Sequence, residues 1–161
     1  MEGKKSQPRA ILVFGAPCSG KSTFAEQFAK QFKAPFVDFS DLVEHHEFTR
    51  KHILVLIEQL TKSHTTLVFE GEMNTKKDRD EIRKLLTKHG YKPSLVWIQT
   101  YDATLKKRLA TALKSPTKAK AEYDKLVADM EAPTDKESPI VLSGKHTYNT
   151  QVKHVLVQLA E

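Results

Sequence analysis

The sequence has little that would place the protein outside the cell or in a membrane. Cys18 is the only cysteine among 161 residues, so the chain cannot form an internal disulfide. No hydrophobic run approaches the roughly 20 residues that a helix needs to span a bilayer. Residues 1–9 are polar, and the short apolar stretch behind them does not match a secretory signal peptide. We therefore expect a cytoplasmic protein that does not associate with membranes.

Patterns typical of zinc sites and of guanine recognition are also missing. His45, His46 and His52 have no cysteines or carboxylates around them at the spacing of a zinc site. The sequence has no N-K-x-D stretch, and segment 143–151 offers no aspartate where guanine recognition would need one. These absences argue against a zinc protein and against a GTPase.

The charge is positive but dispersed. There are 26 lysines and arginines against 20 acidic residues, which gives a formal net charge of +6 and suits an anionic partner. The basic residues are scattered and are not interleaved with aromatic residues, as they would be on a nucleic-acid platform. The composition, 39% hydrophobic and 29% charged, is that of an ordinary soluble domain. Because no long exposed apolar stripe is predicted, we expect a monomer.

Short apolar runs alternate with helical patterns along the whole chain. We expect strands at residues 10–14, 35–39, 65–69, 94–98 and 139–142. We expect helices at residues 21–33, 48–60, 75–89, 102–113, from 116 to just before 133, and 150–160. Segment 48–60 is rich in β-branched residues, but its length and its apolar face favour a helix. The helix from residue 116 should turn inward the side chains of Tyr123, Leu126, Val127 and Met130.

Apolar strands separated by helices predict an α/β fold. Its five-stranded parallel sheet would be covered by helices on both faces, which gives a three-layer αβα sandwich. Residues 1–9 would form a flexible tail, and residues 10–161 would form one domain. Ligands of such sheets bind at the carboxyl ends of the strands. The loops after residues 14, 39, 69, 98 and 142 therefore form the candidate site.

The loop after the first strand carries the most specific motif. Residues 15–22, GAPCSGKS, match G-x-x-x-x-G-K-[ST], and they lie between a predicted strand and a predicted helix, as a P-loop requires. Backbone N–H groups and the helix N-terminus would hold the phosphates, with Lys21 on the β- and γ-phosphates and Ser22 on Mg²⁺. The expected nucleotide-binding residues are Gly15, Ala16, Pro17, Cys18, Ser19, Gly20, Lys21, Ser22 and Thr23. The motif predicts a P-loop NTPase fold.

Carboxylates follow the second and third predicted strands. A kinase that phosphorylates an alcohol needs a carboxylate to orient or deprotonate the hydroxyl. Asp41 is expected to align the acceptor hydroxyl, and Asp38 is the other candidate. Alternatively, Ser40 or Asp41 caps the next helix. Glu70 ends the third strand, where P-loop proteins usually place the acidic residue that holds the Mg²⁺ water shell.

Further polar residues follow Glu70. Glu72 and Asn74 are candidates for contact with an acceptor, and Asn74 is also a candidate cap for the helix at residue 75. Arg79 is expected either to bind an acceptor phosphate or to pair with Asp78 or Glu81, and the sequence leaves both possibilities open.

The last two loops suggest a lid and a site for the base. Arg108 would stabilise charge on the transferred phosphoryl group, within a lid of about residues 106–132 that closes over ATP. Alternatively, Arg108 belongs to a solvated basic helix face. Gly144 would allow the backbone to approach adenine, and Lys145 or His146 would cover the ring, unless this segment is an ordinary turn.

With these parts assembled, residues 10–160 resemble the small P-loop kinases of the polynucleotide-kinase and zeta-toxin type, which have AAA-type ATP-binding domains. The stretches that carry the resemblance are GAPCSGKST (15–23), VDFSD (37–41), the segment 67–98, and LKKRLA (105–110). The resemblance implies ATP-dependent phosphorylation of a hydroxyl group. It also implies Lys21 and Ser22 as phosphate and magnesium residues, an aspartate after strand two as acceptor base, and Arg108 as a lid arginine.

Three departures from that family bear on the acceptor. Glu70 replaces the frequent aspartate, only lysines follow Arg108 in the lid, and the segment 42–44 lacks the arginine that commonly follows the strand-two aspartate. These departures favour a nucleoside, a sugar or another small alcohol over a polynucleotide 5′-hydroxyl. They also motivate an alternative hypothesis, an ATP-binding regulatory module without transferase activity.

Overall fold

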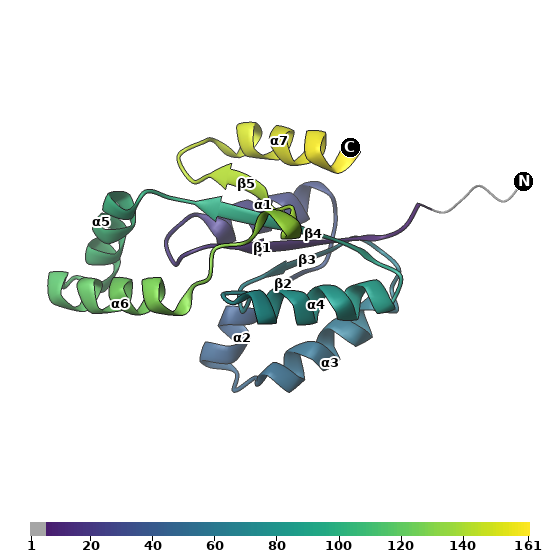
Figure 1. Ribbon diagram of the computed structural model, residues 1–161, viewed down its shortest axis with the longest axis horizontal. Coiled ribbons are helices and arrows are strands. Elements are labelled where there is room, and N and C mark those ends of the chain that lie inside the picture. Colours follow the sequence, from purple (N-terminus) through teal and green to yellow (C-terminus); the bar gives the residue numbers. More distant parts are fainter. Residues whose placement is uncertain (1–5) are drawn as a thin grey trace, which may run out of the picture.

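The computed structural model describes residues 6–161 and confirms the predicted architecture (Figure 1). These residues form one five-stranded parallel sheet with the strand order β2-β3-β1-β4-β5. The strands are β1 (Arg9–Phe14), β2 (Phe36–Asp38), β3 (Leu67–Glu70), β4 (Lys92–Gln99) and β5 (Ile140–Ser143). The helices are α1 (Lys21–Gln31), α2 (Phe39–His45), α3 (Arg50–Thr61), α4 (Lys76–Lys88), α5 (Asp102–Leu113), α6 (Pro116–Asp129) and α7 (Tyr148–Ala160), and a short 3₁₀ helix covers Asp135–Glu137.

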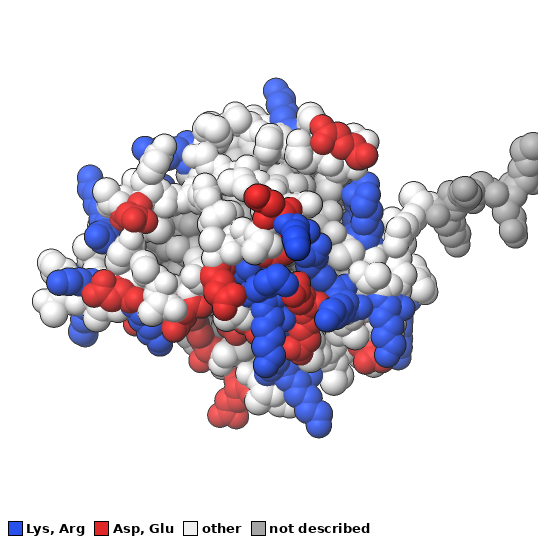
Figure 2. All heavy atoms as spheres, viewed as in Figure 1, with Lys and Arg blue, Asp and Glu red and all other residues white. Residues whose placement is uncertain are grey.

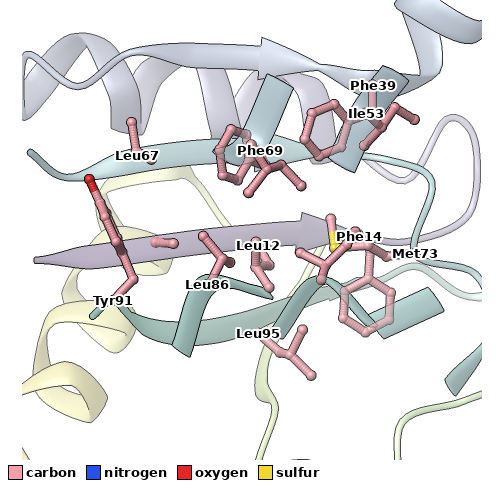
Figure 3. Close-up of a cluster of buried hydrophobic side chains, with 13 residues drawn as sticks. Leu12, Phe14, Phe39, Ile53, Leu67, Phe69, Met73, Leu86, Tyr91 and Leu95 are labelled. Carbon is pink, nitrogen blue, oxygen red and sulfur yellow. The ribbon is translucent and has the colours of Figure 1, made fainter. Parts of the chain in front are cut away.

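Each face of the sheet has its own apolar core. Helices α1 and α7 cover one face, whereas α2, α3 and α4 cover the other (Figure 1). Side chains alternate along β1, so that Ile11 and Val13 belong to the first core and Leu12 and Phe14 to the second. Figure 3 shows the second core, in which Phe14, at the end of β1, lies close to Met73. The P-loop therefore follows directly from a strand that is buried on both faces.

The second strand is shorter than predicted. Phe39 was expected to end it but instead begins α2, because Asp38 caps this helix. The Asp38 Oδ1 atom accepts a hydrogen bond of 3.1 Å from the backbone N–H of Asp41. Neither Ser40 nor Asp41 is the cap, so the helix begins earlier than either alternative predicted.

The first strand begins one residue earlier than predicted. Residues 1–5 of the expected tail lie outside the described residues, but Arg9 already pairs with Lys92 in the sheet. The Arg9 Nη2 atom also donates a hydrogen bond of 2.7 Å to the carbonyl oxygen of Leu159 in α7. Arg9 thus links the first strand to the last helix. None of the helices formed by the described residues is both long enough and apolar enough to cross a membrane.

The carboxyl ends of the strands lie at the end of the molecule from which α5 and α6 project (Figure 1). The P-loop, the loops that follow the other strands and the two projecting helices therefore share one end of the domain.

Candidate active site

The P-loop connects β1 to α1 in a tight curl. Gly20 is the N-cap residue of α1 with φ of 97°, a left-handed conformation that suits glycine, and no side chain caps the helix. Cys18 is also left-handed, with φ of 62°. The backbone N–H of Ser19 donates to the Ala16 carbonyl oxygen over 3.1 Å. Because no side chain occupies the start of α1, its backbone donors remain free for an anion.

Lys21 and Ser22 begin α1 beside this curl. The Lys21 Nζ atom donates to the carbonyl oxygen of Gly15 over 3.2 Å, so the side chain folds back across its own loop. The Ser22 hydroxyl donates to Glu70 Oε1 over 2.5 Å. The exposed side chain of Thr23 follows in the same turn. The motif serine and the acidic residue that ends β3 thus meet although 48 positions separate them in the sequence.

Glu70 has the chemistry of a magnesium site. Only 1% of its surface is exposed, and its second carboxylate oxygen, Oε2, is buried without a hydrogen-bond partner among the described residues. Burial raises the pKa of Glu70 above its usual value, although the hydrogen bond from Ser22 and the charge of Lys21 act in the opposite direction. Mg²⁺ needs only one or two protein oxygens beside phosphate and water. The residues present therefore fit this ion.

Helix α5 reaches the P-loop through Arg108. Its Nη1 atom donates to the carbonyl oxygen of Cys18 over 2.9 Å. The alternative interpretation, a solvated basic face, suits the exposed Lys107, whereas the ammonium group of Lys106 lies 4.6 Å from the ring centroid of Tyr123. Arg108 is therefore bonded to the P-loop backbone and is not part of a purely solvated basic face.

The loop after β4 and the turn after β5 lie against the P-loop. The Thr100 hydroxyl donates to the carbonyl oxygen of Ser19 over 3.1 Å. A Cβ atom at Gly144 would collide with the Thr100 hydroxyl oxygen and would lie 2.5 Å from the Ser19 carbonyl oxygen, so only glycine fits here. The ammonium group of Lys145 lies 4.2 Å from the ring centroid of Tyr101. Gly144 thus lies against the P-loop backbone at Ser19, and the adenine contacts expected for Gly144 and Lys145 stay a prediction.

A cavity of about 1050 Å³ opens between this turn, β4 and the projecting helices. It is lined by Trp97 and Val141 from the sheet and by Lys145 from the last turn. The α6 side chains that were expected to be buried also line it (Tyr123, Leu126, Val127 and Met130). Val127 is 61% exposed. The apolar face predicted for α6 therefore borders an open cavity, whereas Met130, the C-cap residue of this helix, packs against the second core.

The two candidate aspartates lie in different surroundings. Asp38 ends β2 and pairs in register with Glu70 at the end of β3, which places it beside the candidate magnesium site. Asp41 is exposed on the first turn of α2, with its carboxylate 3.5 Å from His46 Nε2. The structure thus brings Asp38 closer than Asp41 to the P-loop.

Glu72 occupies a strained position in the loop after β3. Its φ is 55°, which is uncommon for a residue with a side chain. Burial raises the pKa of its half-buried carboxyl group, with the Arg50 charge acting in the opposite direction. Arg50, the first residue of α3, donates over 2.8 Å to the carbonyl oxygens of Glu72 and Asp78. Arg50 thereby fixes the loop that carries Glu72.

Two predicted roles in this loop need correction. Arg79 is fully buried and pairs with Glu137, with Nε 2.7 Å from Oε1, and neither Asp78 nor Glu81 is its partner. Its guanidinium is enclosed, so it cannot face an acceptor phosphate. Asn74 does not cap α4, because Thr75 is the N-cap and its side chain accepts a hydrogen bond from Asp78 N–H.

Sequence reasoning missed Arg50, Tyr101 and Glu137. Arg50 is a basic residue at the first position of α3, and this position could have suggested a role near the neighbouring loops. Tyr101 lies two residues after the end of β4, in a loop that the sequence already marked as part of the candidate site. Nothing local marks Glu137, because its partner Arg79 lies 58 positions away.

Solved kinase structures share the fold. The gluconokinase of Sinorhizobium meliloti is similar with a TM-score of 0.70 at 17% identity, over 95% of this chain and 92% of that one. The APS kinase of Mycobacterium tuberculosis, solved with AMPPNP and APS, has a TM-score of 0.70 at 17% identity, over 96% of this chain and 99% of that one. The shikimate kinase of Aquifex aeolicus has a TM-score of 0.52 at 18% identity, over 94% of this chain and 96% of that one. At this identity the similarity establishes the fold alone.

The chain belongs to the AAA domain family, whose model matches residues 11–133. No curated protein matches the sequence. The resemblance to kinases of the polynucleotide-kinase and zeta-toxin type stays a prediction.

Proposed function

We propose that the protein is an ATP-dependent phosphotransferase that moves the γ-phosphoryl group of ATP–Mg²⁺ to a hydroxyl group of a small molecule. One observation carries the proposal: Ser22 of the P-loop donates to Glu70, a buried carboxylate with one unpartnered oxygen. This pair supplies the oxygen ligands that a nucleotide-bound metal requires. The kinases of similar fold act on small molecules, as their names state.

The chain's own residues provide positioning and positive charge. The start of α1 and the curl of residues 15–20 direct backbone N–H groups toward the phosphates. Lys21 moves from the Gly15 carbonyl oxygen onto the β- and γ-phosphates when nucleotide enters. Arg108, already at the P-loop, balances charge on the transferred group. Ser22 and Glu70 would hold Mg²⁺, which supplies charge neutralisation to the phosphates.

In this proposal the adenine base binds in the cavity beside Gly144 and Lys145. This part of the cavity is bordered by the Lys145–Tyr101 pair and by the β5 turn. Helices α5 and α6 form the far wall, and as a lid they would close over the base and exclude water from the transfer step.

The acceptor hydroxyl is placed near Asp38. This aspartate lies beside Glu70 in the sheet, whereas Asp41 is exposed and contacts His46. Glu72 is the second candidate contact, held by Arg50. A polynucleotide acceptor is disfavoured, because Arg79 is buried and cannot bind a backbone phosphate. On the face shown in Figure 2, basic side chains gather at the lower centre and right, with acidic side chains between and beside them.

The direct test is transfer of labelled γ-phosphate from ATP–Mg²⁺, with Lys21→Ala as the blank. The acceptors are a panel of nucleosides, sugars and small alcohols, together with a 5′-hydroxyl oligonucleotide. We expect a labelled small-molecule product that is absent with Lys21→Ala. ATP binding without any labelled product would contradict the proposal and favour a regulatory module, and a labelled oligonucleotide would refute the small-molecule assignment.

The acceptor role is tested by comparing Asp38→Asn with Asp41→Asn. Asparagine also caps helices well, so α2 should survive the change at residue 38. We expect Asp38→Asn to lower kcat by about tenfold or more, with little change in the KM for ATP, because a base acts on the hydroxyl and not on the nucleotide. Asp41→Asn should have a much smaller effect. The reverse order of effects would return the role to Asp41.

A further inference from the structure

We propose that Arg79 is a positioning residue that ties the acceptor loop, residues 72–76, to the base of the lid, residues 130–137. The inference rests on the proposed function for its kinetic consequence, but the tie itself is a property of the folded chain. It assigns a role to a buried charge that the transfer mechanism does not otherwise use.

One guanidinium group binds both segments at once. On the acceptor loop, Arg79 Nη1 lies 3.0 Å from the carbonyl oxygen of Met73 and 3.2 Å from that of Asn74. On the lid base, the same nitrogen lies 3.0 Å from the carbonyl oxygen of Glu131. The other side of the fork holds Glu137, with Nη2 3.4 Å from Oε2 in addition to the Nε bond. Both segments are therefore positioned by a single planar group.

A second tie joins the same two segments without Arg79. The backbone N–H of Glu131 donates to the carbonyl oxygen of Asn74 over 2.8 Å. The Glu131 carboxylate accepts a hydrogen bond of 3.0 Å from the backbone N–H of Lys76 at the start of α4. These bonds come directly after α6 ends at Asp129. The lid base thus lies against the loop that follows Glu70 and Glu72.

The guanidinium also contacts the strand that leads into the P-loop. The Arg79 Cζ atom lies 5.1 Å from the ring centroid of Phe14, the residue directly before Gly15. The acceptor loop, the lid base and the end of β1 therefore meet at one side chain, which is fully buried.

Lysine cannot reproduce this arrangement. The guanidinium is a planar fork with five N–H donors, whereas the ammonium group is a compact charge on a flexible stem. With lysine at position 79 the charge that balances Glu137 is kept, but the simultaneous bonds to Met73, Asn74 and Glu131 are lost. Arg79→Lys therefore separates the geometric role from the electrostatic one. Arg83→Lys, one turn further along α4, is the matched control.

The first measurement is hydrogen–deuterium exchange of the whole protein. We expect Arg79→Lys to speed exchange in residues 72–76 and 130–137 together, by about tenfold, because both lose bonds to one group. Arg83→Lys should change neither segment. Glu131→Ala removes an exposed side chain and only the bond to Lys76, so it should give a smaller rise in the same two segments. If Arg79→Lys does not fold, Glu137→Gln decides the question, because it weakens the other side of the same guanidinium contact and should speed exchange in both segments. A rise confined to one segment, or spread evenly over the domain, would overturn the proposal.

The second measurement is kinetic and uses the acceptor identified by the transfer assay. We expect Arg79→Lys to lower kcat by about tenfold and to raise the share of ATP hydrolysed without transfer, because a lid on a loosened base admits water. The KM for ATP should hardly change, since the P-loop backbone is intact. A structural role alone would lower the fraction of folded enzyme without changing the ratio of hydrolysis to transfer. If the wild-type protein transfers no phosphate, the proposed function fails, but the exchange experiment still decides whether Arg79 couples the two segments.

Discussion

Glu70→Gln is expected to lower phosphoryl transfer by about 100- to 1000-fold, the range seen when one element of electrostatic stabilisation is removed. Glutamine keeps the shape of the side chain and a partner for Ser22 but carries no negative charge for Mg²⁺. The measurement is kcat with ATP–Mg²⁺ and the identified acceptor, together with the Mg²⁺ concentration that gives half-maximal rate.

The same variant should be more stable than the wild-type protein at neutral pH in the absence of Mg²⁺. Burial raises the pKa of Glu70, so the folded state prefers the protonated form. The wild-type protein therefore loses stability as the pH rises from the unfolded pKa of about 4.5 through the raised folded pKa. Glutamine cannot ionise, so Glu70→Gln should be more stable than the wild-type protein above that pH range. The difference in stability should vanish below it. Denaturant unfolding at several pH values measures this difference.

Glu26→Gln is the control for Glu70→Gln. This residue is an exposed carboxylate on α1 whose charge acts on Glu70. It should leave transfer and stability nearly unchanged. A Glu70→Gln enzyme that keeps wild-type turnover at limiting Mg²⁺ would show that the metal is held elsewhere.

Glu137→Gln should destabilise the protein by about 3–5 kcal/mol at pH 7, because it leaves the buried charge of Arg79 without its partner. The Glu137 side chain is 2% exposed and that of Arg79 is 0% exposed. Burial alone would raise the pKa of Glu137, but hydrogen bonds from Arg79 and Thr134 and the charge of Arg79 together lower it from 4.5 to about 2. The carboxylate thus stabilises the fold wherever it is ionised.

The sign of the pH dependence follows from that lowered pKa. The contribution of Glu137 is fully present above pH 4.5 and is lost as the pH falls toward 2, where the folded protein also takes up the proton. Denaturant unfolding should therefore show a large difference between Glu137→Gln and the wild-type protein at pH 7 and a shrinking one below pH 4.5. Asp135→Asn, an exposed residue on the same 3₁₀ helix, is the control and should change little. A difference that persists unchanged at low pH would mean that packing, not charge, explains the loss.

Local features predicted most of the fold. The strands and helices follow from apolar periodicity, and segment 48–60 is a helix as its length indicated. The main error in the strands, at Phe39, arose because Asp38 caps α2, and a single hydrogen bond decided where the strand ended. Capping competes with strand formation within a few residues, and such close balances are hard to resolve from pattern alone.

In the candidate site, too, the residues close together in the sequence were easier to predict than those with distant partners. The P-loop occupies consecutive residues, so each predicted contact depends only on a strand before it and a helix after it. Arg79 was harder, because its environment depends on a partner beyond α6. The sequence offered two partners nearby, Asp78 and Glu81, but both bind Arg50 instead.

The sequence by itself determined the parallel α/β sheet, the P-loop motif between β1 and α1, and the end of the sheet at which the candidate site lies. Periodicity and a contiguous motif are local properties, because they depend only on residues that are close together in the sequence. Only the tertiary structure decided that Ser22 meets Glu70, that Arg108 reaches Cys18, and that Arg79 is buried against Glu137. These contacts join residues 48, 90 and 58 positions apart. Their partners are set by how the layers pack, which no short stretch of sequence specifies.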